Sequence, residues 1–239
     1  MNDGTWVSLF SGGKDSVGAY WRAREAGLAV GHLLTVHPAE DSYLYHVPGT
    51  GLASLAAESM GLPLRSVPGP AASGHESSRR GDEELVPLED ALAELDDELA
   101  GGVTGVTVGA IESRFQKDRI EGLCDRLGID LYAPLWHEDP RELGAWLVET
   151  GFEIRIVQVA AAGFDRSWLG RQLDDAALAD LAALNEEYGV HLLGEGGEYE
   201  TIVTDGPHME RAIELDVTPV WEGTRGHLEI EDAWLEPEP

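Results

Sequence analysis

Apolar residues in the first half of the chain fall into short continuous runs and into segments that repeat with a helical period. The continuous runs predict buried strands over residues 5–10, 30–36 and 105–109. The periodic segments predict helices over residues 16–26, 52–60, 88–99 and 116–127. Because strands and helices alternate, we expect an α/β domain with a parallel sheet covered by helices.

Glycines stand where the predicted helices should end. Glycine tolerates the left-handed backbone that closes many helices, so a glycine after an apolar-periodic segment is a stop signal. Five predicted helices are followed by one, at Gly27, Gly61, Gly128, Gly151 and Gly189. These positions support the helix assignments in both halves of the chain.

The pattern changes after residue 134. Two further helices are predicted over residues 140–150 and 175–188, and β patterns cover residues 153–161, 201–204, 212–220 and 227–233. We therefore expect a first domain over residues 1–134 and a smaller α+β domain over residues 135–239, although a chain of this length can also form one large α/β domain. The stretch PGPAASGHESSRRG, residues 68–81, has neither period and predicts a surface loop.

Composition narrows the class of protein. The 239 residues are 43% hydrophobic and 26% charged, as in globular proteins, and no apolar run approaches the roughly 20 residues of a membrane span. The amino terminus enters a strand without the features of a signal peptide, so we expect a cytoplasmic protein. The single cysteine, Cys124, excludes an internal disulfide and a thiolate zinc site, and no histidine spacing resembles a zinc site.

The net charge of −29 constrains the partners. A field this negative repels phosphate backbones, so broad nucleic-acid binding is not expected unless a local basic patch overrides the repulsion. Only two of the 16 basic residues are lysines, Lys14 and Lys117. Acidic, lysine-poor surfaces suit a protein kept soluble in high salt, where screening weakens self-repulsion, and this composition favours a halophilic, haloarchaeal source.

A glycine-rich turn joins the first predicted strand to the first predicted helix. It reads Ser11-Gly12-Gly13-Lys14-Asp15-Ser16. Glycines let the backbone approach an oxyanion, while the free N–H groups of a helix start, the lysine and the two hydroxyls supply donors. Asp15 can hold Mg²⁺ or accept bonds from the free amides. The turn predicts a phosphate site, and the alternative is an ordinary strand-to-helix turn in which these residues only cap the helix.

The sequence SGGKDS in this position resembles the signature of the PP-loop ATP pyrophosphatases, which cut ATP between its α and β phosphates. Its spacing differs from that of the Walker-A motif. The resemblance implies a doubly wound parallel sheet of the adenine-nucleotide hydrolase type, with ATP held by residues 11–16. Ligands of such sheets lie beyond the carboxyl ends of the strands, so Val36, His37 and Gly109 are expected to frame the nucleotide. A surface histidine is the alternative for His37.

Two further polar segments carry candidate chemistry. Residues 109–119, GAIESRFQKDR, follow a predicted strand, and residues 194–201, GEGGEYET, hold three carboxylates and three glycines. Together with residues 124–128 and 133–136, they resemble the diphthine–ammonia ligase family in order and spacing from residue 6 to residue 205. The resemblance implies that diphthine on elongation factor 2, ATP and ammonia give diphthamide, AMP and pyrophosphate. The alternatives are a polar helix start for the first segment and a solvated acidic hairpin for the second.

The implied reaction assigns roles to these residues. A carboxylate is a poor acyl donor, and joining it to the α-phosphate of ATP makes an acyl-adenylate that ammonia can attack. Lys14, Asp15, the loop amides and Mg²⁺ would stabilise the developing charge, and we expect Glu195, Glu198 and Glu200 to be catalytic. Diphthine also carries a trimethylammonium group, which carboxylates and aromatic faces hold well. The expected substrate contacts are Ser113, Gln116, Arg119, Gly196, Gly197, Tyr199 and Thr201.

Other functions of the same fold stay open at this point. A different PP-loop ligase, or a relative that thiolates tRNA or forms lysidine, would use the same phosphate loop, although thiolases commonly need paired cysteines and a basic surface. A protein that senses an adenine nucleotide without turning it over would also fit the fold. The sequence leaves the oligomeric state open, with a homodimer as one option.

Overall fold

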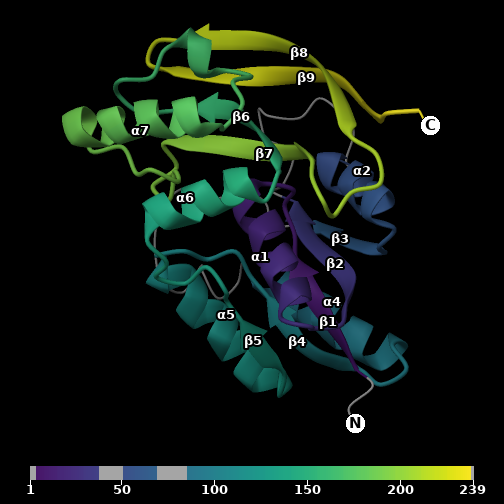
Figure 1. The fold of residues 1–239 in the computed structure, drawn as a ribbon. Coiled ribbons are helices and arrows are strands. Elements are labelled where there is room, and N and C mark those ends of the chain that lie inside the picture. The colour runs from purple at the N-terminus through teal and green to yellow at the C-terminus, as the bar shows by residue number, and fades with distance from the viewer. Residues whose placement is uncertain (1–3, 38–50, 69–84, 238–239) are drawn as a thin grey trace. The chain divides into compact units, whose positions relative to one another are not determined.

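The computed structural model describes residues 4–37, 51–68 and 85–237 (Figure 1). The surface loop predicted at residues 68–81 falls almost wholly outside these residues. The chain divides into two compact units. The first holds residues 1–11, 15–42 and 62–136, and the second holds residues 12–14, 43–61 and 137–239. The domain boundary that the sequence places between residues 134 and 135 stays a prediction.

The first unit is built on a parallel sheet of five strands in the order β3-β2-β1-β4-β5. The strands are β1 (Thr5–Leu9), β2 (Val30–His37), β3 (Leu64–Pro68), β4 (Val103–Thr107) and β5 (Asp130–Tyr132). The strand order reverses between β1 and β4, as in doubly wound sheets, and this confirms the expected α/β class. Ligands of such sheets collect beyond the strand ends at this reversal.

Three helices cover the described part of this sheet: α1 (Lys14–Glu25), α4 (Val86–Glu98) and α5 (Arg114–Leu127). The apolar faces of α4 and α5 share one core with the strands, in which Val7, Leu34 and Val106 are almost fully buried together with Leu92 of α4 and Leu123 of α5. Burial of each such side chain stabilises the fold by roughly 1.5–3 kcal/mol. This shared core holds α4 and α5 against the sheet whose strand ends carry the polar loops.

The second unit contains an antiparallel sheet in the order β7-β6-β9-β8. Its strands are β6 (Glu153–Val159), β7 (Tyr199–Asp205), β8 (Ile213–Glu222) and β9 (Arg225–Leu235), and the last two form the long yellow hairpin in Figure 1. Its helices are α2 (Gly51–Met60), α6 (Pro140–Glu149), α7 (Asp175–Tyr188) and the short 3₁₀ turn η1 (Arg166–Trp168). A mixed helix and sheet fold agrees with the α+β pattern of the sequence.

The helix ends follow the sequence closely and the strands less so. All five glycines expected to stop helices have φ between 64° and 86°. The apolar pattern does not predict β3 or β5, and β4 begins two residues earlier than predicted. Strand β5 has only three residues, too few for an apolar period, and no residue of β3 is buried, so neither strand shows a continuous apolar run. Short strands of this kind are defined by their neighbours in the sheet.

Candidate functional site

The phosphate loop begins where β1 ends. The Ser16 hydroxyl, in the first turn of α1, accepts the Ser11 N–H at 3.2 Å and lies 3.1 Å from the Ser11 hydroxyl. Gly12 has φ +82°, a backbone conformation that favours glycine. The two serines therefore brace the turn while the glycine allows it, which explains why the sequence needs these residue types in this order.

Gly109, which follows β4, lies against the start of α1. A Cβ added to Gly109 would stand 2.5 Å from the carbonyl carbon and oxygen of Asp15 and 2.8 Å from the Ser16 nitrogen. Those atoms belong to the backbone and cannot turn aside. A glycine at this position thus lets the end of β4 approach the phosphate loop closely.

A cavity of about 320 Å³ opens beyond the carboxyl ends of β1, β2 and β4. Its size is in the range of small-molecule pockets. The lining is apolar at Leu34 and Val36 of β2 and at Ile120 of α5, and it is polar at the phosphate loop, with Ser11 and Asp15. Five predicted nucleotide residues line it together: Ser11, Asp15, Ser16, Val36 and Gly109. The side chain of His37 lies outside the described part of the structure.

The central residues of the loop, Gly12, Gly13 and Lys14, belong to the second unit. The N–H of Val203 donates to the Gly12 carbonyl at 2.9 Å, and the N–H of Lys14 donates to the Thr201 hydroxyl at 3.3 Å. The Lys14 side chain is only 3% exposed, and its Nζ lies 5.3 Å from the centre of the Tyr199 ring. Strand β7 therefore holds this part of the phosphate loop along its outer edge, and the ring of Tyr199 faces the lysine cation.

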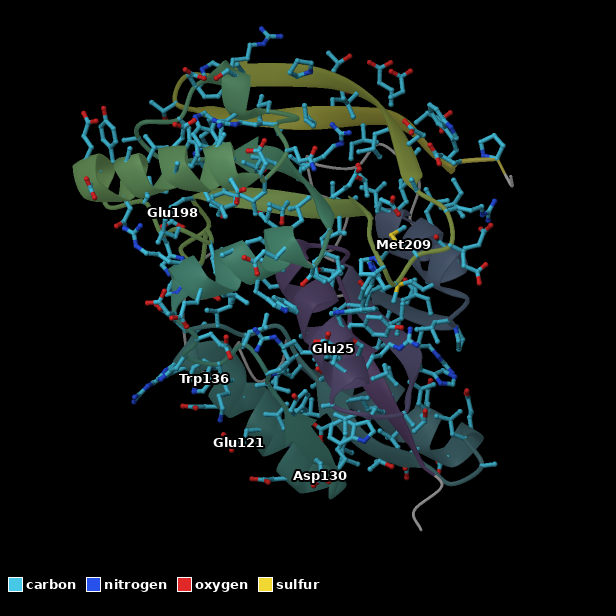
Figure 2. The ribbon with its side chains drawn as sticks, viewed as in Figure 1. Glu25, Glu121, Asp130, Trp136, Glu198 and Met209 are labelled. Carbon is cyan, nitrogen blue, oxygen red and sulfur yellow. The ribbon has the colours of Figure 1, made fainter. Side chains whose placement is uncertain are left out.

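Residues 191–198 form a turn before β7 that we call the glutamate loop. Both carboxylate oxygens of Glu198, labelled in Figure 2, accept backbone N–H groups, from His191 at 3.0 Å and from Gly196 at 2.8 Å. Gly194 and Gly197 have φ +70° and +78°. A Cβ on Gly194 would meet the Tyr199 carbonyl oxygen at 2.7 Å. The loop is thus shaped by its glycines and tied by a carboxylate.

The other groups of the motif differ in exposure. Tyr199 is 2% exposed, and its hydroxyl donates to the Leu192 carbonyl at 2.7 Å. Glu195 is half-buried, and Glu200 is exposed on β7, where Gln158 of β6 donates to its carboxylate at 3.4 Å. Desolvation by neighbouring protein atoms nevertheless raises the pKa of the Glu200 carboxyl. Glu200 is thereby a stronger base than an ordinary surface carboxylate.

The segment over residues 109–119 leads into α5. Ser113, half-buried, directly precedes the helix, and its carbonyl accepts the Lys117 N–H at 3.0 Å. Lys117 lies over the Trp136 ring at 5.6 Å and pairs with Glu121 at 2.8 Å. Arg119 is half-buried on the same helix, and the side chain of Gln116 lies outside the described part of the structure. Their contacts with substrate stay predictions.

The structure adds residues that the sequence did not single out. His191 is the main one, because it opens the glutamate loop and its Nδ1 accepts two backbone N–H groups. Thr35 lines the cavity, and Gln158 reaches the predicted catalytic Glu200. In the sequence, a histidine three residues before a glycine-rich acidic run only weakly indicates a role in that loop, because the sequence does not show that a ring nitrogen accepts backbone N–H groups.

Metal and membrane features can be judged for the described residues. Among them, no cluster of three or more His, Cys, Asp or Glu side chains could hold a metal ion by itself. Mg²⁺ is commonly bound by one or two carboxylates together with substrate phosphates, so Asp15 in the cavity wall fits that mode. Within the same residues, no helix combines the length and apolar character needed to cross a membrane.

Two protein-family models match the chain. The diphthamide synthase N-terminal domain matches residues 4–131, and the diphthamide synthase C-terminal domain matches residues 139–235. The first match covers the parallel sheet and the phosphate loop, and the second covers the antiparallel sheet and the glutamate loop.

Individual relatives agree with these matches. The chain is 37% identical over 223 residues to the diphthine–ammonia ligase of Danio rerio, covering 89% of this chain and 86% of that protein. It is 35% identical over 229 residues to the diphthine–ammonia ligase of Homo sapiens, covering 90% of this chain and 84% of that protein. The ligase of Schizosaccharomyces pombe is 33% identical over 93% of this chain, which spans 38% of that longer protein.

Proposed function

The chain belongs to the diphthamide synthase family, and we propose that it amidates diphthine on elongation factor 2 with ammonia through an acyl-adenylate made from ATP. Membership makes it an ATP-dependent ligase that forms a C–N bond. The main support for the proposed mechanism is that Lys14 of the phosphate loop contacts β7 directly after the glutamate loop. Within one unit, Lys14 bonds Thr201 through its N–H and faces Tyr199 with its cation.

The first step joins the carboxylate to the nucleotide. A carboxylate oxygen of diphthine attacks the α-phosphorus of ATP, the bond from that phosphorus to the bridging oxygen breaks, and pyrophosphate leaves. Positive charge from Lys14 and donors such as the Ser16 hydroxyl offset the negative charge that develops on the phosphates. Mg²⁺, held through Asp15 and the phosphates, would supply further neutralisation.

The second step forms the amide. Ammonia attacks the acyl carbon, the bond from this carbon to the AMP oxygen breaks, and one proton is released. We assign the role of proton acceptor to Glu200, because it stands between Tyr199 and Thr201, the two residues of β7 that contact Lys14, and because desolvation raises the pKa of its carboxyl. No protein nucleophile is required, so the remaining residues of the site act by positioning.

The trimethylammonium group of diphthine has no N–H to donate, so its partner must attract the positive charge, as a carboxylate or an aromatic face does. We assign Glu195 to it, because Glu195 is half-buried on the glutamate loop, whereas the Tyr199 ring is buried and already faces Lys14. Glu195→Gln is expected to raise the KM for diphthine-bearing elongation factor 2 about tenfold and to leave the KM for ATP unchanged. Glu186→Gln, an exposed position on α7, is the control. An unchanged protein-substrate KM for Glu195→Gln would remove this assignment.

Isotope transfer tests the acyl-adenylate. Diphthine labelled with ¹⁸O in both carboxylate oxygens should give AMP with one ¹⁸O atom and diphthamide with the other, because the oxygen that attacks phosphorus leaves with AMP. Mass spectrometry of the released AMP measures this transfer. AMP without label, formed alongside diphthamide, would rule out attack by the diphthine carboxylate on the α-phosphorus.

The acidic composition of the chain indicates the conditions in which its activity should be measured. The lysine-poor, acidic chain with net charge −29 suits high salt, and we propose that activity and stability rise with salt concentration. A cytoplasmic location fits an enzyme that modifies a translation factor. Free ammonia is the proposed nitrogen source, because the only cysteine, Cys124, is buried and cannot serve a glutaminase reaction.

A further inference from the structure

His191 opens the glutamate loop and has no part in the chemistry described above. It follows α7 and lies four residues before Glu195, the carboxylate assigned to the trimethylammonium group. The residue is half-buried, and its backbone N–H donates to the Glu198 carboxylate at 3.0 Å. This bond holds the backbone of His191 at the start of the glutamate loop.

The ring binds that backbone through one nitrogen. His191 Nδ1 accepts the N–H of Leu193 at 3.1 Å and the N–H of Glu195 at 3.3 Å. A ring nitrogen that accepts hydrogen bonds carries no proton, so this arrangement places the ring N–H on Nε2. Turning the ring over would point a C–H group at two N–H donors and lose both bonds. The geometry thus selects one ring orientation and one tautomer.

These bonds complete a closed frame. Glu198 ties His191 to Gly196, and the Tyr199 hydroxyl donates to Leu192. Every one of these bonds ends on backbone of the glutamate loop, and two of them set the position of Glu195 and its neighbour. The frame is attached to Lys14 through the Tyr199 ring. Changes at His191 should therefore displace the glutamate loop with little effect on the rest of the fold.

We propose that His191, with its ring N–H on Nε2, is a positioning residue for amidation, because Nδ1 accepts the backbone N–H groups of Leu193 and Glu195. This inference rests on the proposed function for its catalytic consequence. A displacement of about 1 Å in a group that contacts substrate can lower the rate on the order of 10²-fold. The loss is expected in kcat, and not in the KM for ATP, because the two N–H groups that Nδ1 accepts belong to the glutamate loop and not to the phosphate loop.

Two substitutions separate the tautomer from the bulk of the ring. In His191→Asn the amide oxygen can take the place of Nδ1 and accept the same N–H groups, whereas in His191→Gln it reaches the place of Nε2. We expect H191N to keep kcat for diphthamide formation within threefold of the wild type. H191Q should lose at least tenfold in kcat with less than a twofold change in the KM for ATP. Equal kcat for the two variants, at equal melting temperature, would overturn the positioning role.

If H191Q does not fold, a measurement on the wild-type protein still tests the position of the His191 proton. In ¹⁵N–¹H spectra of the wild type, with H191N used for assignment, the His191 proton is expected on Nε2. A proton on Nδ1 would overturn the proposal. Wild-type turnover in the same assay reports on the proposed function separately, because its absence refutes the amidation reaction whatever the tautomer.

Discussion

Replacing Gly109 by alanine tests whether the close approach of β4 to the phosphate loop matters for nucleotide binding. The added Cβ would stand 2.5 Å from the Asp15 carbonyl carbon and oxygen. Both atoms must retreat by about 1 Å to reach an ordinary contact of roughly 3.5 Å. Asp15 and Ser16 line the cavity, so this retreat moves two residues that are proposed to hold the phosphates.

The expected effect follows from that displacement. A misplacement of about 1 Å costs on the order of 10² in rate, and overpacking costs about 1–3 kcal/mol in the free energy of unfolding. Gly109→Ala should therefore lower kcat/KM for ATP by roughly 10- to 100-fold. Release of AMP from ATP, measured with diphthine-bearing elongation factor 2 and ammonia in high salt, provides the assay.

Gly122→Ala is the matched control. Gly122 lies within α5, and the nearest atom to a Cβ there is the flexible Arg126 Nη1 at 3.8 Å. Alanine inside a helix is favoured over glycine by roughly 0.5–1 kcal/mol, so this variant should be as active as the wild type and at least as stable. A kcat/KM for ATP within twofold of the wild type in Gly109→Ala would show that the loop tolerates the displacement.

Three further outcomes are expected. Lys14→Ala should lower kcat by on the order of 10²–10³, the usual loss for one charge-stabilising donor, and a loss under threefold would contradict its role. Burial raises the pKa of the Cys124 thiol to about 11, so a thiol reagent at pH 8 should modify the unfolded chain and leave the folded protein unmodified; rapid modification of folded protein would refute the burial. Desolvation raises the pKa of the Glu200 carboxyl in the folded protein. The protonated carboxyl therefore favours folding when the pH lies below its ordinary pKa, and this stabilisation is lost as the pH rises through the pKa of the folded protein. Glu200→Gln should therefore raise the melting temperature at pH 7 and leave it unchanged near about pH 3, and the opposite trend would show that the carboxylate is stabilised.

Long periodic segments made the helices predictable, and short strands escaped prediction. α7 was predicted with the observed bounds, because its glycine stop and apolar period agree. β3 and β5 have five and three residues, and their positions depend on pairing with β2 and β4. Pairing across a sheet is a tertiary property that a local pattern does not contain.

The candidate site divides in the same way. A glycine-rich turn after a strand announces a phosphate loop, because glycine, lysine and serine are needed there whatever the rest of the fold. The different roles of the three glutamates within GEGGEYET depend on the contacts that each one makes in the folded protein. The sequence shows three equivalent glutamates, whereas the structure ties Glu198 to two backbone amides and leaves Glu200 exposed beside Gln158. His191 was missed for the same reason.

One experiment tests the proposed amidation most directly. The protein is incubated in high salt with ATP, Mg²⁺, ammonia and elongation factor 2 that carries diphthine, with Lys14→Ala as the disabled control. We predict one AMP and one pyrophosphate for each diphthamide formed, and no AMP when the factor lacks diphthine. Formation of ADP, or the absence of both AMP and diphthamide with wild-type protein, would contradict the proposed function.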